Sequence, residues 1–206
     1  MEYPKFTIIM RGYTKEEAFK IAKNIDGLEE NFAIEVTLNT LNAFEIIRLL
    51  NENFGNHLKV GAGTVRNLKE AEEAIANNAQ FLLGPHVFSK EIFDLAKKNQ
   101  VLTIPGAFTP SEIVNQFEMG ADIVKVFPAR TLGADYFKDI QAPLGKIPLM
   151  AVGGINFENY QSFFKKGASF VGIGSSIFNG RKILDMGDME IRGMLRKYIE
   201  KLQEVN

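Results

Sequence analysis

Short apolar runs recur along the chain at near-regular intervals and alternate with stretches of helical periodicity. The runs are rich in β-branched residues, as is typical of strands. The run over residues 123–127 places one lysine among four apolar residues without polar alternation, which indicates a strand covered on both faces. Eight such runs predict eight strands, at residues 6–10, 32–37, 58–60, 80–83, 101–104, 122–127, 148–152 and 170–173.

Between these runs, apolar residues three and four positions apart predict helices. Thr14 precedes Lys15-Glu16-Glu17 as an N-cap, and Thr109-Pro110 opens another helix with proline in its first turn. Gly120 and Gly167 follow two predicted helix ends. The predicted helices cover residues 15–25, 43–53, 68–77, 90–98, 110–119, 135–140 and 157–166, with a final amphipathic helix over residues 188–203.

Strands that alternate with helices favour β–α units around a parallel sheet. Eight units in 206 residues lie near the lower size limit of a (β/α)8 TIM barrel. The alternative is a doubly wound open sheet, which should carry a glycine-rich dinucleotide turn after the first strand. Arg11-Gly12-Tyr13 is not such a turn, and no linker divides the chain. We therefore predict an α/β protein with a single (β/α)8 barrel domain over residues 1–206.

Composition excludes several classes of function. Lys plus Arg number 24 against 25 Asp plus Glu, a net charge of −1 that argues against nucleic-acid binding through bulk charge. The absence of cysteine excludes disulfides and thiolate nucleophiles. No segment reaches the roughly 18 apolar residues of a membrane span, and residues 1–10 lack the pattern of a signal peptide. We expect a cytoplasmic protein that binds neither nucleic acid nor membranes.

Lys125 is the sharpest chemical signal in the chain. It shares strand parity with Ile123 and Phe127, so its amine is expected among apolar side chains. Burying a lysine is costly unless the ammonium reaches the rim, pairs with a carboxylate or loses its proton. A lysine with a lowered pKa attacks carbonyl groups as the free amine.

Glu35 is a second charged residue within a predicted strand. It shares a face with Ala33 and Thr37, while Ile34 and Val36 point toward the helices. Glu35 is either a structural partner of Lys125 or Arg11, or a group that shuttles protons across the barrel mouth. One buried acid and one buried lysine on different strands of a barrel favour Schiff-base chemistry.

Small residues after the last two strands indicate an anion site. Gly153-Gly154 follows the seventh strand and Gly174-Ser175-Ser176 the eighth, where such barrels bind phosphate through backbone N–H groups and a helix N-terminus. Glycines alone only turn the chain, but two sets at the expected strand ends predict phosphate. Arg11, after the first strand, adds a contact to phosphate or carboxylate, unless it is an ordinary rim arginine. His57 and His86 lack metal-ligand spacing, so no metal is expected, although His86 could face the mouth.

Six motifs occur in order along the chain, at Ile9–Gly12, Glu35–Leu38, Gly61–Val65, Ile104–Gly106, Lys125–Pro128 and Gly153–Ile155. Together they resemble the 2-keto-3-deoxy-6-phosphogluconate / 4-hydroxy-2-oxoglutarate (KDPG/KHG) aldolases. The resemblance implies a class I aldolase on a (β/α)8 barrel, with no cofactor and usually assembled as a homotrimer. It implies a 2-keto-3-deoxy sugar acid phosphate as substrate, cleaved to pyruvate and glyceraldehyde 3-phosphate.

The same resemblance assigns roles to residues. Lys125 matches the Schiff-base lysine and Glu35 the general acid and base. Arg11, Thr64 and Phe127 match residues around pyruvate, and the glycine and serine positions match the phosphate site. The full set of substrate-binding residues expected from motifs and resemblance is Arg11, Asn39, Thr64, Pro85, Phe127, Gly153, Gly154, Gly174, Ser175 and Ser176.

Three departures from the gluconate-type pattern concern specificity. Many such members carry Arg in place of Asn39, Thr in place of Val152, and Ser-Pro-Gly in place of Gly84-Pro85-His86. Asn39 and Val152 look more like the branch that acts on the galactonate epimer. Three other functions stay open: 4-hydroxy-2-oxoglutarate cleavage, a phosphosugar epimerase or thiamine-phosphate synthase-like barrel, and a non-catalytic phosphosugar-binding barrel.

Overall fold

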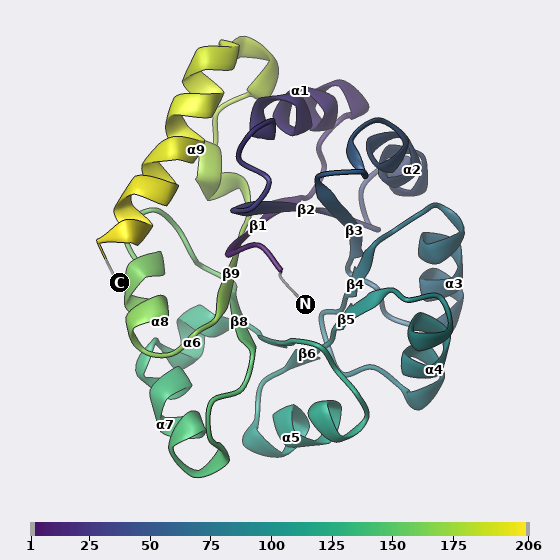
Figure 1. Ribbon diagram of the computed structural model, residues 1–206, viewed down its shortest axis with the longest axis vertical. Helices are drawn as coiled ribbons and strands as arrows, with labels where there is room; N and C mark the ends of the chain where they lie inside the picture. The colour runs from purple at the N-terminus through teal and green to yellow at the C-terminus, as the bar shows by residue number, and fades with distance from the viewer. Residues whose placement is uncertain (1–2, 205–206) are drawn as a thin grey trace.

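The computed structural model describes residues 3–204 and has a parallel barrel at its centre. The strands form one sheet in the order β5-β4-β3-β2-β1-β9-β8-β7-β6, in which every pairing is parallel. Figure 1 shows this ring of strands surrounded by helices. The strands are β1 (Phe6–Met10), β2 (Phe32–Thr37), β3 (Lys59–Gly63), β4 (Phe81–Leu83), β5 (Leu102–Ile104), β6 (Gly106–Ala107), β7 (Val124–Val126), β8 (Leu149–Val152) and β9 (Phe170–Ile173).

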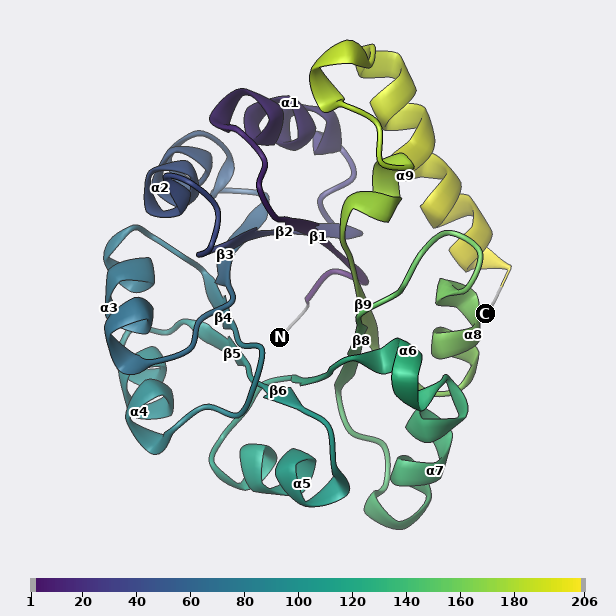
Figure 2. The same ribbon diagram turned by 180° about the vertical axis from the view of Figure 1, so that it is seen from behind.

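The helices form an outer layer, which Figure 2 shows from the opposite side. The structure confirms the predicted (β/α)8 architecture and excludes the open doubly wound sheet. The helices are α1 (Lys15–Ile25), α2 (Ala43–Phe54), α3 (Leu68–Ala76), α4 (Lys90–Lys98), α5 (Pro110–Glu118), α6 (Ala129–Leu132), α7 (Asp135–Leu144), α8 (Tyr160–Lys165) and α9 (Asp188–Gln203), with short 3-10 helices η1 (Ser175–Phe178) and η2 (Ile183–Asp185).

The prediction of eight strands was wrong at one point: the predicted fifth strand, residues 101–104, ends before Pro105, but a further short strand, β6, follows that proline. Strand β5 pairs with β4, and β6 pairs with β7. Proline has no N–H to give to a ladder, so the regular pairing stops there. The Pro105 carbonyl accepts the Lys125 N–H at 2.9 Å, and this bond helps close the barrel.

Two apolar layers hold the barrel. The inner layer fills the interior and includes Ala33, Ile123 and Met150, whereas the outer layer, with Ile34 and Val36, packs under the helices. Tyr3 belongs to the inner layer, where it makes edge contacts with Phe81 and Phe170 at centroid distances of 5.5 and 5.4 Å. The predicted strand parity around residue 35 is therefore confirmed.

Helix ends follow the predicted signals in several places. Thr14 and Thr109 both form capping boxes, and α1 and α9 have the predicted bounds. The prediction was wrong at α8, which begins at Tyr160 because Asn156 and Asn159 form a side-chain-stabilised turn before it. It was also wrong for β3, which continues through three residues to Gly63, and for α7, which extends to Leu144.

Candidate active site

A cavity of about 400 Å³ opens at the carboxyl ends of the strands, where such barrels carry their active sites. It brings together all of the predicted site residues except Asn39, which contacts one of them. The lining residues are Ile9, Arg11, Glu35, Thr64, Pro85, Lys125, Phe127, Val152, Gly153, Gly154, Ile155, Gly172, Gly174, Ser175 and Ser176.

Lys125 lies in the middle of β7 and is only 5% exposed. Its Nζ atom is 4.9 Å from the centroid of the Phe127 ring. Within residues 3–204, no ion pair involves this amine. Burial lowers the pKa of Lys125, and the Arg11 charge lowers it further, against the opposing effect of Glu35. A lowered pKa increases the fraction of the amine that is unprotonated, and the unprotonated form is the one that attacks carbonyl groups.

Glu35 lies on β2, which is separated from β7 by β1, β9 and β8 around the barrel. The residue is 1% exposed, and its Oε2 atom is buried with no hydrogen-bond partner in the described part of the chain. Burial raises the pKa of Glu35 to about 6, although the charges of Lys125 and Arg11 oppose this rise. A carboxyl group with a pKa near neutrality both accepts and donates protons. Glu35 forms none of the ion pairs found within residues 3–204, so a salt bridge to Lys125 or Arg11 does not account for its burial.

Arg11, at the end of β1, is held in place by two neighbouring loops. Its Nη1 donates to Asn39 Oδ1 at 2.9 Å, and its Nη2 lies 3.5 Å from Thr64 Oγ1. Thr64 has a φ of +59°, which is strained for a β-branched residue. The loops after β2 and β3 therefore orient one guanidinium beside the cavity.

The loops after β8 and β9 present unpaired backbone N–H groups. No N–H of Gly153, Gly154, Ser175 or Ser176 donates to another group within residues 3–204. The carbonyl groups of the two glycines are already occupied, by the Arg130 N–H at 3.0 Å and by Asn159 Nδ2 at 2.9 Å. Ser176 Oγ donates to the Ile155 carbonyl at 2.9 Å. Free N–H groups with their carbonyls turned away suit an anion.

Besides Val152, which the sequence singled out for specificity, three residues that line the cavity were not among the predicted site residues, namely Ile9, Ile155 and Gly172. Ile9 has the same strand parity as Arg11, so the alternation that placed Glu35 also indicates Ile9. Gly63 packs against the side chain of Glu35, leaving no room for a methyl group at residue 63. No local pattern signals this contact, because it joins two strands. His86 is not part of the lining, and its Nδ1 lies 2.8 Å from the Val87 carbonyl.

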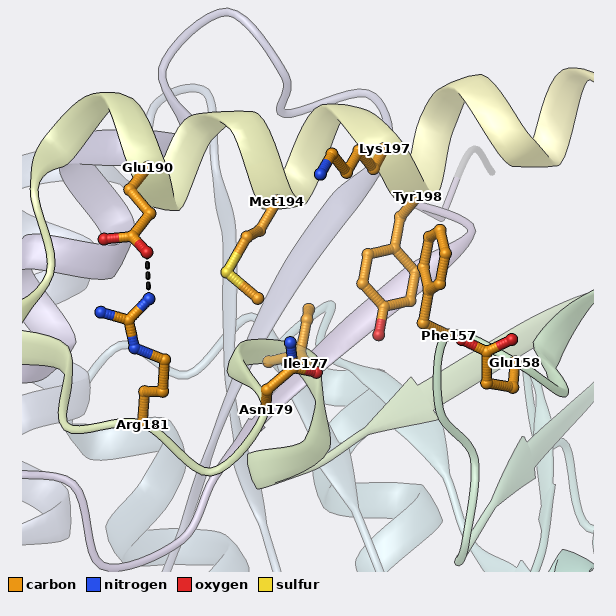
Figure 3. Close-up of a pocket in the computed structure, with 9 residues that line it drawn as sticks. All are labelled: Phe157, Glu158, Ile177, Asn179, Arg181, Glu190, Met194, Lys197 and Tyr198. Carbon is orange, nitrogen blue, oxygen red and sulfur yellow. Dashed lines mark hydrogen bonds and ion pairs between the residues drawn. The ribbon is translucent and has the colours of Figure 1, made fainter.

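A second cavity, of about 300 Å³, lies between α9 and the segments that follow β8 and β9. Figure 3 shows its lining, in which Arg181 is paired with Glu190 and Tyr198 lies beside Phe157. It contains none of the predicted site residues, and Arg181, one of the two cations in its lining, is already paired with Glu190.

One cluster of metal-ligand residues lies away from both cavities. Side-chain ligand atoms of Asp26, Glu29 and His57 are within 4.8 Å of one another, on loops that lead into β2 and β3. These loops lie at the opposite end of the barrel from the carboxyl ends of the strands. Glu29 Oε1 already accepts the Gly27 N–H at 2.9 Å. We assign no metal to this cluster.

The parallel barrel, with a cavity at the carboxyl ends of its strands, defines a (β/α)8-barrel enzyme. The family model for KDPG and KHG aldolase matches residues 5–192. The chain belongs to this family and is an aldolase, a carbon–carbon lyase. The resemblance found in the sequence is thereby confirmed.

Individual relatives agree with this assignment. The 2-dehydro-3-deoxy-6-phosphogalactonate aldolase of Escherichia coli (strain K12) is 26% identical over 197 residues, 95% of each chain. The probable enzyme of the same name from Rhizobium meliloti (strain 1021) is 31% identical over 196 residues, 94% of this chain and 90% of the relative.

Solved structures agree as well. The chain is similar to a native KDPGal structure, with a TM-score of 0.85 and 25% identity over 98% of this chain and 100% of the other. It is also similar to a KDPG aldolase from Legionella pneumophila in which pyruvate was captured as a covalent carbinolamine, with a TM-score of 0.82 and 26% identity over 94% and 93% of the two chains. Among the described residues, no helix is both long and apolar enough to span a membrane.

Proposed function

We propose that the protein is a class I aldolase that cleaves a 2-dehydro-3-deoxy-6-phospho sugar acid to pyruvate and D-glyceraldehyde 3-phosphate through a Schiff base on Lys125. The observation that carries this proposal is that one cavity is lined by both a buried amine and a buried carboxyl group, neither of them in an ion pair within residues 3–204. No cofactor enters the reaction, because the protonated imine itself withdraws the electrons.

The first half of the reaction joins substrate and enzyme. The unprotonated Nζ of Lys125 adds to the C2 ketone and forms a carbinolamine. Glu35 supplies the proton with which the C2 hydroxyl leaves as water, and the protonated imine remains. The substrate carboxylate is held by the guanidinium of Arg11, which Asn39 and Thr64 orient.

The second half breaks the carbon–carbon bond. Glu35 removes the proton of the C4 hydroxyl, the C3–C4 bond cleaves, and its electron pair moves into the imine to give an enamine. Glyceraldehyde 3-phosphate leaves with its new carbonyl at the former C4. The enamine is protonated at C3, and hydrolysis releases pyruvate and restores the amine. The pKa of Glu35, about 6, suits a group that both gives and takes protons in this sequence.

Two features of the substrate, its phosphate group and its configuration at C4, are inferred from cavity residues other than Lys125 and Glu35. The free N–H groups after β8 and β9 support a phosphorylated substrate over 4-hydroxy-2-oxoglutarate, which has no phosphate. Asn39 and Val152 support the galactonate epimer, since both differ from the gluconate-type pattern. Asn39 acts through Arg11, and Val152 lines the cavity directly.

The decisive experiment is borohydride reduction in the presence of pyruvate, followed by peptide mapping. A single reduced pyruvyl adduct on Lys125 is expected, with none in Lys125→Met. Both phosphorylated epimers and 4-hydroxy-2-oxoglutarate are then assayed in parallel, and the galactonate epimer should have the highest kcat/KM. An unmodified Lys125 in an active enzyme would overturn the mechanism.

The assembly, domain organisation and location also belong to this proposal. We infer a homotrimer of single-domain subunits in the cytoplasm. Exposed apolar side chains on loops at the mouth end of the barrel support a subunit interface, namely Leu41, Val87 and Phe108, which are 84%, 39% and 39% exposed. Sedimentation equilibrium should give three times the subunit mass, and Leu41→Asp should lower it.

A further inference from the structure

Arg130 lies against the loop with the free N–H groups, on an element that the sequence did not predict. It is the second residue of α6, which follows the Lys125 strand directly. Its backbone N–H donates to the Gly153 carbonyl. A Cβ atom on Gly154 would come within 2.7 Å of Arg130 Cβ and Cδ and within 3.1 Å of Cγ, so the arginine stem runs across Gly154.

The guanidinium of Arg130, by contrast, is free. Arg130 is exposed, and within residues 3–204 its side chain takes part in no ion pair. An arginine whose aliphatic carbons are packed against the backbone, but whose guanidinium is unpaired, has lost part of its conformational freedom before any ligand binds. It therefore binds an anion at a smaller entropic cost than an arginine that is free throughout.

The neighbouring groups lack positive charge. Gly153, Gly154, Ser175 and Ser176 offer backbone N–H groups, but none carries a charge. The guanidinium of Arg11 is turned toward Asn39 and Thr64, in the loops after β2 and β3. A phosphate monoester held only by the N–H groups would keep most of its negative charge uncompensated.

We propose that the guanidinium of Arg130 closes over Gly154 and binds the phosphate of the substrate, as a charge-assisted partner to the backbone N–H groups. This inference rests on the proposed function, since it needs a phosphorylated substrate. Arg130 is thus a specificity residue that favours phosphorylated over unphosphorylated 2-keto acids. It takes no part in the chemistry at Lys125.

The test compares Arg130→Gln and Arg130→Lys with the wild type on two substrates. Because a hydrogen bond to a charged group is involved, Arg130→Gln should raise KM for the phosphorylated substrate about tenfold to hundredfold, with kcat nearly unchanged. The inhibition constant of inorganic phosphate should rise in parallel. Arg130→Lys should recover part of both losses. The KM for 4-hydroxy-2-oxoglutarate and the rate of reductive trapping of pyruvate should stay at wild-type values.

Arg181→Gln is the matched control, because it removes the same charge from an arginine already paired with Glu190. Its kinetics should equal those of the wild type, and circular dichroism checks the folding of every variant. Wild-type KM and phosphate inhibition in Arg130→Gln would overturn the inference while leaving the aldolase mechanism intact. If the wild type formed no pyruvyl adduct, the proposed function would be overturned instead. Calorimetric titration of wild type and Arg130→Gln with inorganic phosphate would then still decide whether Arg130 binds phosphate.

Discussion

The side chain of Glu35 packs directly against the backbone of Gly63, so closely that a Cβ atom at residue 63 would overlap the carboxylate. The two residues lie on adjacent parallel strands, where Thr37 is the register partner of Gly63 and Glu35 that of Gly61. Glu35 Oε2 has no hydrogen-bond partner in the described part of the chain, so packing rather than hydrogen bonding positions this carboxyl group. The absence of a side chain at residue 63 therefore leaves the space that the carboxyl group of Glu35 occupies.

Gly63→Ala should therefore push Glu35 out of position without removing any reacting group. A displacement of about 1 Å can cost a hundredfold in rate, so kcat should fall by roughly one to two orders of magnitude. Steady-state kinetics measures this fall. Gly187→Ala is the control, because no atom lies within 4 Å of a Cβ at residue 187 and its φ is −73°. Full activity in Gly63→Ala would mean that the position of Glu35 is not critical.

Burial of Glu35 should cost stability in a way that depends on pH. Its pKa rises from 4.5 to about 6 on folding, so above pH 6 the folded state holds a carboxylate that is more stable in the unfolded chain. A pKa difference of one between the two states corresponds to about 1.4 kcal/mol, so Glu35→Gln should stabilise the fold by about 2 kcal/mol at pH 7.5. At about pH 3.5 and below, the carboxyl group is mostly protonated in both states, and the difference should vanish.

Urea denaturation of Glu35→Gln and wild type at pH 7.5 and at about pH 3.5 measures this dependence. Glu200→Gln, an exposed change on α9, controls for the loss of a surface charge. A stability difference between Glu35→Gln and wild type that is independent of pH would show that the charge of Glu35 is not its cause.

Two neighbouring charges should affect the lowered pKa of Lys125 in opposite directions. The charge of Arg11 lowers this pKa further, whereas the charge of Glu35 raises it. Arg11→Ala should therefore move the pH midpoint of Lys125 reactivity upward, and Glu35→Gln should move it downward. The rate of reductive methylation with formaldehyde, followed at Lys125 by peptide mass as a function of pH, reports this midpoint. Formaldehyde has no carboxylate, so its reaction does not depend on binding to Arg11. Exposed Lys138 in the same digest is the internal reference, and shifts of the same sign in both variants would contradict the electrostatic account.

Much of the barrel could be predicted because its signals are local. Period-two burial placed Glu35 and Lys125 in the interior, and caps at Thr14 and Thr109 placed two helix starts. The two-residue strand β6 after Pro105 could not be predicted, since it is too short to show a period and is defined by its pairing with β7. Helix α6 was missed because four residues are too few to show a period.

The same distinction between local signals and long-range contacts applies to the residues of the candidate site. Reactive and glycine-rich positions at strand ends could be identified from residue type, and the cavity brings them together. The contacts of Gly63 with Glu35 and of Arg130 with Gly154 could not be identified in this way, because each joins residues more than 20 positions apart in the chain. The orientation of Arg11 by Asn39 is a contact of the same kind, and only the resemblance drew attention to that asparagine.

Thr64 combines a strained backbone conformation with a side-chain hydroxyl that contacts Arg11, so a substitution there should affect both stability and substrate binding. A left-handed φ of +59° costs a threonine about 1 kcal/mol or more, whereas asparagine tolerates this region. Thr64→Asn should therefore raise the free energy of unfolding by about 1 kcal/mol and, by removing the hydroxyl beside Arg11 Nη2, raise KM several-fold. Asn78 has a φ of +66° on an exposed turn outside the cavity, so Asn78→Thr is the reciprocal control and should destabilise by a similar amount with unchanged kinetics. Thermal denaturation and steady-state kinetics on both variants measure the two effects, and a Thr64→Asn variant that is less stable than wild type would show that local packing of the threonine outweighs its backbone strain.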